Sequence, residues 1–440
     1  KTWVLETGEH FLGFAIPGPT PTGVVRPRMQ EERFQVEFNV VRPACTQGRL
    51  PTLYLIPALE DPFEVLDEYH HVSESLGLTK KRCDDHPDFW VAHHFMPYLE
   101  HHRLVKERNA SGEGNYTGVM PQQAVLGWLH TVKQDLQLDT MCMVLEQGAY
   151  RYYGDYRPTE AMGGVEGFRQ MVDELREENV RIAYFLHPFM TNTKVDFYRE
   201  HPEAFCKPKD PAHKTRYGLE HGDANPQFAL LDWTHPVGRE HMLDQVEMLI
   251  SDGPGCLNCD WLRSNQWKSP DPRVFDFHDP DWGIGDLMTM KVQKLLYEKV
   301  KSIKPHACVN KSGLTDPYMQ PYADVALISE DWNGSTNAWY LRSRISMRLL
   351  DDLIFITAPY FLTITKSYEY FMGMAVWNVL QDPIVKHAIH PYMHFRELSD
   401  KDFRRRFAGV RVQSIAPINI TDQIHVDLND NSPGGVEMWR

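Results

Sequence analysis

Few cysteines, no long apolar run and no excess of basic residues set the first limits on this chain. Its 440 residues include seven cysteines, an odd number that is too sparse for a disulfide-stapled scaffold. No apolar run approaches the ~18 residues that a membrane-spanning helix needs, so we expect no membrane partner. Acidic residues outnumber basic ones by 60 to 46, which gives a net charge of −14. Because phosphate recognition needs clustered lysine and arginine, we also expect no nucleic-acid partner.

A secretory leader and an initiating methionine are also missing at the start, which predicts a mature, trimmed or partial chain. Five Asn-X-Ser/Thr sequons hint at secretion, although cytoplasmic proteins also carry unused ones; they begin at Asn109, Asn115, Asn310, Asn333 and Asn419. A secreted and a cytoplasmic location both stay open. The apolar fraction of 42% and the charged fraction of 24% are those of an ordinary folded protein.

The hydrophobic pattern divides the chain into three regions. Residues 1–85 alternate over Phe34–Val41 and then show helical spacing over 61–76, which predicts a β-rich segment and a linking helix. Residues 404–440 return to alternation and predict a short C-terminal β element. The region between them, 86–403, is predicted to be the catalytic unit.

Within 86–403, short apolar runs alternate with amphipathic stretches. The predicted strands are Phe89–Phe95, Thr140–Glu146, Arg181–His187, Phe228–Asp232, Cys256–Trp261, Ala307–Val309, Asp324–Ser329 and Leu353–Thr357. The predicted helices are Gln122–Gln134, Val165–Asn179, His235–Ser251, Gly285–Ser302, Ala338–Asp351 and Tyr368–Leu380. This alternation predicts an α/β fold with parallel strands, and eight runs without a glycine-rich phosphate loop favour a (β/α)8 TIM barrel over an open sheet.

Functional residues of such a barrel lie at the carboxyl-terminal ends of its strands. The predicted ends carry a polar set: His93, His94, Glu146, His187, Asp232, Asp260, Lys311, Glu330 and Asp331. Several carboxylates around one mouth suit glycoside hydrolysis, which needs two carboxyl groups flanking an oxocarbenium-like transition state. A single Asp after a strand is more often a helix cap or a salt-bridge partner, so it is the joint arrangement that favours catalysis.

Asp260 and Asp331 stand out because a tryptophan follows each of them, Trp261 and Trp332. An aromatic ring beside a carboxyl group removes water and raises its pKa, which suits a general acid. The pair therefore forms the predicted catalytic centre.

Five segments resemble, in order and spacing over roughly residues 50–400, the α-galactosidases of glycoside hydrolase family 36 and the wider group of families 27, 31 and 36. They are Leu145–Tyr150, Gly154–Pro158 with the helix at 164–179, Leu231–Pro236, Cys256–Arg263, and Lys311–Asp316 continuing to Ile328–Asp331. The third resembles the family's Leu-Asp-x-x-x-Pro, and the fourth its Lys-Trp-Asp-Met-Asn-Arg nucleophile strand.

This resemblance implies a retaining double displacement on a glycoside or oligosaccharide, without metal or organic cofactor. Asp260 would be the nucleophile and Asp331 the acid/base, with Glu330 as the alternative acid. The substrate-binding residues it implies are Glu146, Gln147, His187, Asp232, Asn258, Arg263, Lys311, Glu330 and Trp332.

The sugar-binding positions depart from the family. Glu146 and Gln147 stand where the family has two Asp that read the outer sugar hydroxyls, and Asn258 stands where it has Lys. The Gly-Gly-Arg stretch is replaced by Leu314-Thr315, without the Arg. We therefore expect the anomeric chemistry to be kept and unmodified galactose to be handled poorly.

Other patterns leave alternatives open. Cys256-x-x-Cys259 could be a redox or metal pair, but residues three apart on a strand face opposite ways, which favours buried structural thiols. Trp128, Trp267 and Trp339 suit the core or rim better than a sugar platform. The competing functions are a raffinose-synthase-type transglycosylase, a non-catalytic carbohydrate-binding barrel and a metal-dependent barrel hydrolase; a homo-oligomer also stays open.

Overall fold

The computed structural model describes residues 2–6, 11–19, 24–30, 33–39, 52–59, 64–79, 93–96, 121–136, 140–145, 148–210, 228–264, 269–312, 317–329, 354–357, 363–364, 368–369 and 371–377. Among them no helix is long and apolar enough to span a bilayer. The predicted helix at 338–351 and the predicted β element at 404–440 lie outside the described residues.

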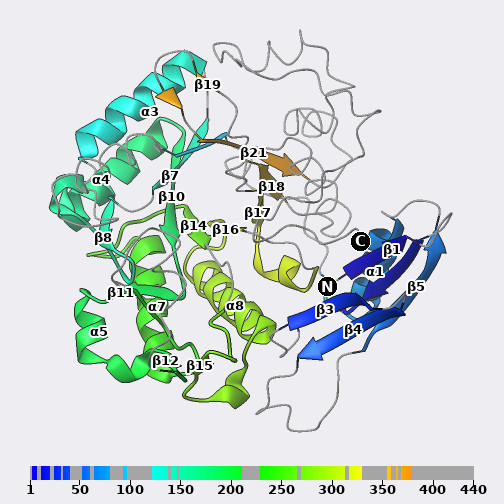
Figure 1. Ribbon diagram of the computed structural model, residues 1–440. Helices are drawn as coiled ribbons and strands as arrows, with labels where there is room; N and C mark the ends of the chain where they lie inside the picture. The colour runs from blue at the N-terminus through cyan, green and yellow to red at the C-terminus, as the bar shows by residue number, and fades with distance from the viewer. Residues whose placement is uncertain are drawn as a thin grey trace.

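The N-terminal region contains two antiparallel sheets and a helix (Figure 1). Strands β1 (Thr2–Glu6), β2 (Phe11–Ala15) and β5 (Tyr54–Leu59) form one sheet, and β3 (Val24–Gln30) pairs with β4 (Arg33–Asn39). Helix α1 (Glu64–Ser75) is the helix predicted over 61–76, and it buries Val65, Leu66 and Tyr69. A Cβ at Gly13 would lie 2.3 Å from Val65 Cγ1, so glycine lets the helix approach the sheet closely. The region boundaries at 85 and 403 stay predictions.

Eight further strands close into a ring (Figure 1). In ring order they are β7 (Met141–Leu145), β10 (Val180–Leu186), β14 (Trp261–Ser264), β16 (Cys308–Ser312), β17 (Val325–Ser329), β18 (Ile354–Thr357), β21 (Phe371–Trp377) and β6 (His93–Met96), which returns to β7. All neighbours pair in parallel except β21, which is antiparallel to both β18 and β6. The α/β character is therefore as predicted. The ring also has eight strands, but they are not all the predicted ones, and β21 departs from the regular alternation of a (β/α)8 barrel.

The remaining elements surround this ring. The helices are α3 (Gln122–Leu136), α4 (Gly164–Glu177), α5 (Asp196–Glu200), α7 (Pro236–Ile250) and α8 (Asp286–Ile303), with short 3-10 turns η2 (Glu160–Met162), η3 (Pro202–Ala204), η4 (Pro280–Trp282) and η5 (Pro317–Tyr322). The outer strand pairs are β8 (Tyr150–Tyr152) with β9 (Asp155–Pro158), β11 (Met190–Asn192) with β13 (Phe228–Leu230), β12 (Lys207–Pro208) with β15 (Phe275–Asp276), and β19 (Thr363–Ile364) with β20 (Tyr368–Glu369).

Three predicted elements are wrong. The run at 228–232 is β13, which pairs antiparallel with β11 outside the ring. Most of the run at 256–261 is not a strand, and β14 begins only at its last residue, Trp261. The Leu257 and Cys259 N–H groups donate to the Met248 and Leu249 carbonyls of α7, so they do not pair with a neighbouring strand. The helix predicted at 368–380 is β20 followed by β21. Short apolar runs fit a strand and a helix equally well, and here the partner available for hydrogen bonding decides.

Strand register sorts the ring residues into outward and inward sets. Ile182, Tyr184 and Leu186 of β10 belong to the core shared with the helices, and the Phe168 ring of α4 meets Tyr184 edge-on at 5.5 Å. The intervening residues face the barrel interior, since successive strand residues point to opposite sides. Two interior layers follow from the pairing: Val144, Ala183, Trp261 and Cys308, and above them Phe185, Arg263, Asn310 and Val325.

Replacing Gly154 or Gly167 by alanine is expected to change the stability of the protein in opposite directions. Gly154 has a φ of 90°, and a Cβ there would lie 2.5 Å from Thr191 Cγ2, so Gly154→Ala is expected to cost about 1–3 kcal/mol. Gly167 lies inside α4 with open space at its Cβ position, so Gly167→Ala is expected to stabilise by about 0.5–1 kcal/mol. Urea unfolding of both variants measures the difference, and equal midpoints would contradict the hairpin geometry.

Candidate functional site

His187 follows β10 directly, at the carboxyl-terminal edge of the ring. The Met190 N–H donates to His187 Nδ1 at 3.2 Å, so the neutral ring carries its proton on Nε2. The Tyr156 hydroxyl donates to the His187 carbonyl at 3.1 Å and accepts from its N–H at 2.9 Å. Burial raises the pKa of Tyr156, which keeps this hydroxyl protonated. His187 is thus an orientated, buried imidazole where the sequence predicts a substrate contact.

Asp232 lies beyond β13 and is buried. Its carboxylate accepts hydrogen bonds from two backbone N–H groups and one hydroxyl. Its Oδ1 accepts from Thr234 N at 2.9 Å and Thr234 Oγ1 at 2.7 Å, and its Oδ2 accepts from His278 N at 2.7 Å. These bonds join the start of α7 to the loop before η4. The geometry supports a structural role and corrects the expected placement of Asp232 at the end of a barrel strand.

Arg263 lies in the upper interior layer of the barrel and is 2% exposed. Its guanidinium carbon is 5.3 Å from the centre of the Phe185 ring, a cation–π contact. Asn310, its register neighbour, has a buried Oδ1 with no hydrogen-bond partner among the described residues. Lys311, predicted as a site residue, is buried on the opposite face of β16 from Asn310. The alternation of β16 could have pointed to Asn310, but the sequence analysis selected Lys311.

The structure corrects the placement of Asp260. This residue was expected at the carboxyl-terminal end of a strand, but it precedes Trp261, the first residue of β14. Its carboxylate is held by Arg176 Nε at 3.0 Å, Lys304 Nζ at 3.4 Å and Arg181 Nε at 3.7 Å. We call Asp260 with these three cations the basal cluster. It lies at the amino-terminal end of the strands, opposite to the mouth where a substrate would bind.

Asn258 belongs to the same basal network and not to a sugar pocket. Its side chain donates to Asp173 Oδ1 at 2.9 Å and accepts from Lys304 Nζ at 2.8 Å, while its carbonyl accepts from Arg176 at 2.6 Å. A φ of 56° turns the chain here toward β14, a conformation that Asn tolerates better than most residues. Burial lowers the pKa of Lys304, and the Asp260 charge opposes that change.

The other predicted site residues lie outside the described residues: Glu146, Gln147, Glu330, Asp331 and Trp332. Their places in the chain are still informative, because Glu146 directly follows β7 and Glu330 directly follows β17. The side chains of His93 and His94 on β6 are likewise outside the described part.

The described part of the chain includes the two thiols of the Cys256-x-x-Cys259 motif. No group of three or more His, Cys, Asp or Glu residues there could hold a metal ion. Cys256 and Cys259 are both free thiols, and burial raises the pKa of Cys259 to about 12. A protonated buried thiol is a poor nucleophile.

A histidine pair that the sequence analysis missed lies beside Asp232. The rings of His235, at the start of α7, and His278 are 4.4 Å apart and edge-on. Burial and, secondly, the nearby His278 lower the pKa of His235 from its ordinary value of 6.5. Separated by 43 positions in sequence, the two carry no common motif that could have predicted the contact.

The basal cluster predicts that Asp260 contributes to the stability of the fold. Asp260→Asn leaves three cations without their carboxylate and is expected to lower the free energy of unfolding by about 1–3 kcal/mol, because the partners are partly exposed. Asp271→Asn, which weakens an exposed pair with Arg273, is the control and should cost about 0–1 kcal/mol. Denaturant unfolding measures both, and wild-type stability of Asp260→Asn would refute the role of the cluster.

The contact between His235 and His278 predicts how stability depends on pH. Because the fold favours neutral His235, protons bind the unfolded chain more readily, and stability should fall as the pH drops through about 6.5. His278→Gln should raise the pKa of His235 part of the way back, while His71→Gln on α1 should not change it. NMR titration of the imidazole C–H signals gives both values, and an unchanged His235 pKa in His278→Gln would exclude the coupling.

Solved structures with a similar fold include α-galactosidases. TtGalA of Thermus thermophilus, in complex with stachyose, matches with a TM-score of 0.54 and 13% identity over 92% of this chain and 78% of that chain. The galactosidase domain of the α-galactosidase–sucrose kinase AgaSK matches with a TM-score of 0.52 and 11% identity over 92% of this chain and 52% of that chain.

A third similar structure is the GH36 α-galactosidase AgaA of Geobacillus stearothermophilus with raffinose, at a TM-score of 0.51 and 10% identity over 93% of this chain and 54% of that chain. No family model and no curated protein matches this chain. At these identities the likeness establishes the fold. The resemblance to family 36 α-galactosidases that the five sequence segments predict is thereby confirmed at the level of the fold.

Proposed function

We propose that this chain is a glycoside hydrolase of α-galactosidase-like type, with its active site at the carboxyl-terminal mouth of a TIM barrel. The observation that carries the proposal is the likeness, over 92% of the chain, to an α-galactosidase solved with the galactoside stachyose. The ring of eight strands supports it, since such rings place catalytic groups at one mouth.

Asp331 is the proposed acid/base, with Glu330 as the alternative. Glu330 directly follows the last residue of β17 and Asp331 comes one position later, so we propose that both act at the carboxyl-terminal edge of the ring. Glu146 follows β7, which lies four positions from β17 in the ring of eight and hence on the opposite side. Two carboxyl groups from opposite sides of a mouth are the arrangement that glycoside hydrolysis uses.

Asp260 is not carried into this proposal as the nucleophile. Its carboxylate is bound by three cations at the amino-terminal end of the strands, opposite to the mouth where the substrate is proposed to bind. We therefore assign the second carboxylate to Glu146. In a retaining reaction Glu146 would attack the anomeric carbon while Asp331 protonates the leaving oxygen, and Asp331 would then deprotonate the incoming water.

Four of the predicted binding residues are kept as proposed sugar contacts at the mouth. His187 presents an orientated ring after β10, and Gln147 and Trp332 follow β7 and β17 in the chain. Arg263 lies below them in the interior and is proposed to form part of the floor. Asp232, Asn258 and Lys311 are not among the proposed sugar contacts. Asp232 is bound to Thr234 and His278, Asn258 belongs to the basal network, and Lys311 lies on the opposite face of β16 from the barrel interior.

One observation favours a second candidate, a carbohydrate-binding barrel without catalysis. The interior face of β14 carries Trp261 and Arg263 and no carboxylate, although the resemblance places the nucleophile on this strand. A binding barrel would need no carboxylate pair.

Release of chromophore from a panel of aryl α-glycosides separates the two candidates. A hydrolase should turn over at least one member, and Asp331→Asn should lower kcat/KM by about 10²–10⁴-fold for substrates with poor leaving groups, less for activated aryl groups. Glu146→Gln should abolish turnover. Asp260→Asn should lower stability and leave the kcat of the folded protein near wild type.

The outcomes distinguish the assignments. Sugar binding without any turnover in the folded wild type would establish the binding barrel. Loss of kcat in folded Asp260→Asn, with wild-type sugar affinity, would return the nucleophile role to Asp260. NMR of the first-formed product anomer should show retention; inversion would make Glu146 the base that activates water.

A further inference from the structure

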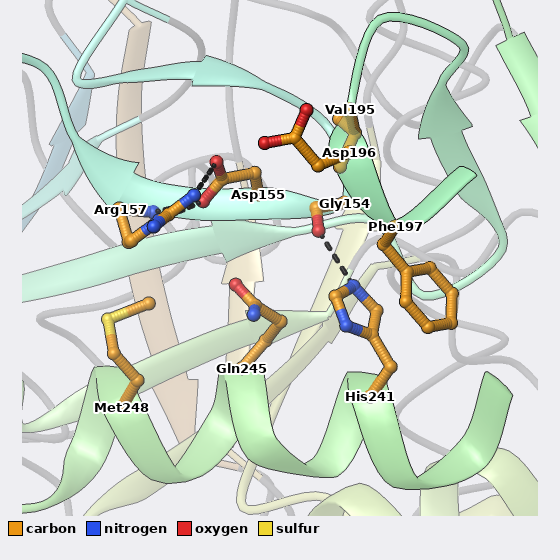
Figure 2. Close-up of a pocket in the computed structure, with 9 residues that line it drawn as sticks. All are labelled: Gly154, Asp155, Arg157, Val195, Asp196, Phe197, His241, Gln245 and Met248. Carbon is orange, nitrogen blue, oxygen red and sulfur yellow. Dashed lines mark hydrogen bonds and ion pairs between the residues drawn. The ribbon is translucent and has the colours of Figure 1, made fainter. Parts of the chain in front are cut away.

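A cavity lies outside the barrel, between the β8–β9 hairpin, α5 and α7 (Figure 2). Its volume is about 200 Å³. His241, Gln245 and Met248 project into it from successive turns of α7, and the hairpin with Asp155 and Arg157 covers the other side. This cavity is separate from the mouth of the ring and has no part in the proposed hydrolysis.

The walls of the cavity are held in place before any ligand arrives. The His241 Nε2–H donates to the Gly154 carbonyl at 2.9 Å, and the His241 ring stacks on Phe197 with centroids 3.7 Å apart and planes 5° apart. Tyr156 N donates to Gln245 Oε1 at 3.1 Å. The left-handed turn at Gly154 fixes the hairpin above them. Preorganised walls reduce the entropy that binding would otherwise cost.

These bonds determine which polar groups remain for a ligand. With its proton on Nε2, the neutral His241 ring offers Nδ1 as an acceptor, and burial lowers the pKa of His241, which favours this neutral ring. Because Gln245 Oε1 accepts from Tyr156, the amide NH2 of Gln245 is left as the donor. Apolar surface comes from Met248 and Val195.

The charges around the cavity are balanced. Asp155 pairs with Arg157 at 2.6 Å, and Asp196 pairs with Arg199. Among the lining residues, an anion would meet the carboxylates of Asp155 and Asp196, and a cation would meet the guanidinium group of Arg157 and two carboxylates that are already paired. A ligand with hydroxyl groups can donate to His241 and the carboxylates and accept from Gln245 and Arg157, while its C–H face covers the apolar surface.

We propose that this cavity is an auxiliary binding site for one neutral sugar ring, separate from the barrel mouth. The site would hold a terminal pyranose of a longer glycan or a free glycoside. It needs no catalytic group, so it stands or falls independently of the proposed hydrolase activity.

Methyl NMR of the full chain with methyl α-galactoside and methyl α-glucoside as probes tests the site. The Met248 methyl signal should shift saturably with at least one of them, while the signal of Met171, buried on α4, should stay in place. Gln245→Glu keeps the acceptor for Tyr156 N and removes the donors, so it should weaken this binding at least tenfold. Gln170→Glu, the same change on the exposed face of α4, should leave the affinity within twofold.

Arg157→Gln is a second variant for the binding test. The Arg157 side chain is exposed, so the substitution should leave the fold intact, and it should weaken binding several-fold. An unmoved Met248 signal at the solubility limit of both probes, or equal affinity in wild type, Gln245→Glu and Arg157→Gln, would overturn the proposal. The aryl α-glycosidase assay reports separately on the barrel mouth, because a protein without hydrolysis should still show the Met248 response.

Discussion

Closure of the eight strands into a ring is the constraint on which the other features depend. Once the pairing from β7 through β10 and β14 to β16 is set, every side chain on these strands faces either the helices or the interior. The ring thereby places Arg263 beside Asn310 in the upper interior layer and leaves Lys311 on the other face. It also sets which loops meet at the carboxyl-terminal mouth.

The two ends of the ring serve different purposes. At the amino-terminal end, Asp260 draws Arg176, Arg181 and Lys304 together and joins α4, β10 and the residue after α8 to the segment before β14. At the carboxyl-terminal end lie His187 and the last residues of β7 and β17, Leu145 and Ser329. Stabilising contacts at one end leave the other end free to vary, which is how one fold accommodates different chemistry.

Outside the ring, the β8–β9 hairpin connects the two proposed sites through a short set of bonds. Tyr156 binds the backbone of His187 at the mouth with its hydroxyl, and its N–H donates to Gln245 at the outer cavity. Gly154 permits the turn and receives the bond from His241. One hairpin therefore positions a residue of the mouth and one wall of the cavity.

Local pattern was enough to predict the α/β class, the helices α1, α3, α4, α7 and α8, and the five segments whose order resembles family 36 α-galactosidases, because periodicity and turn residues act over a few positions. It misplaced β13, β14 and β21, since a short apolar run does not encode its hydrogen-bonding partner. Asp260 shows the consequence: preceding and not ending β14, it is carried to the opposite end of the barrel. The contacts of His235 with His278 and of Asp260 with Lys304 join positions more than forty residues apart, and such contacts exist only after the ring has closed and the helices have packed around it.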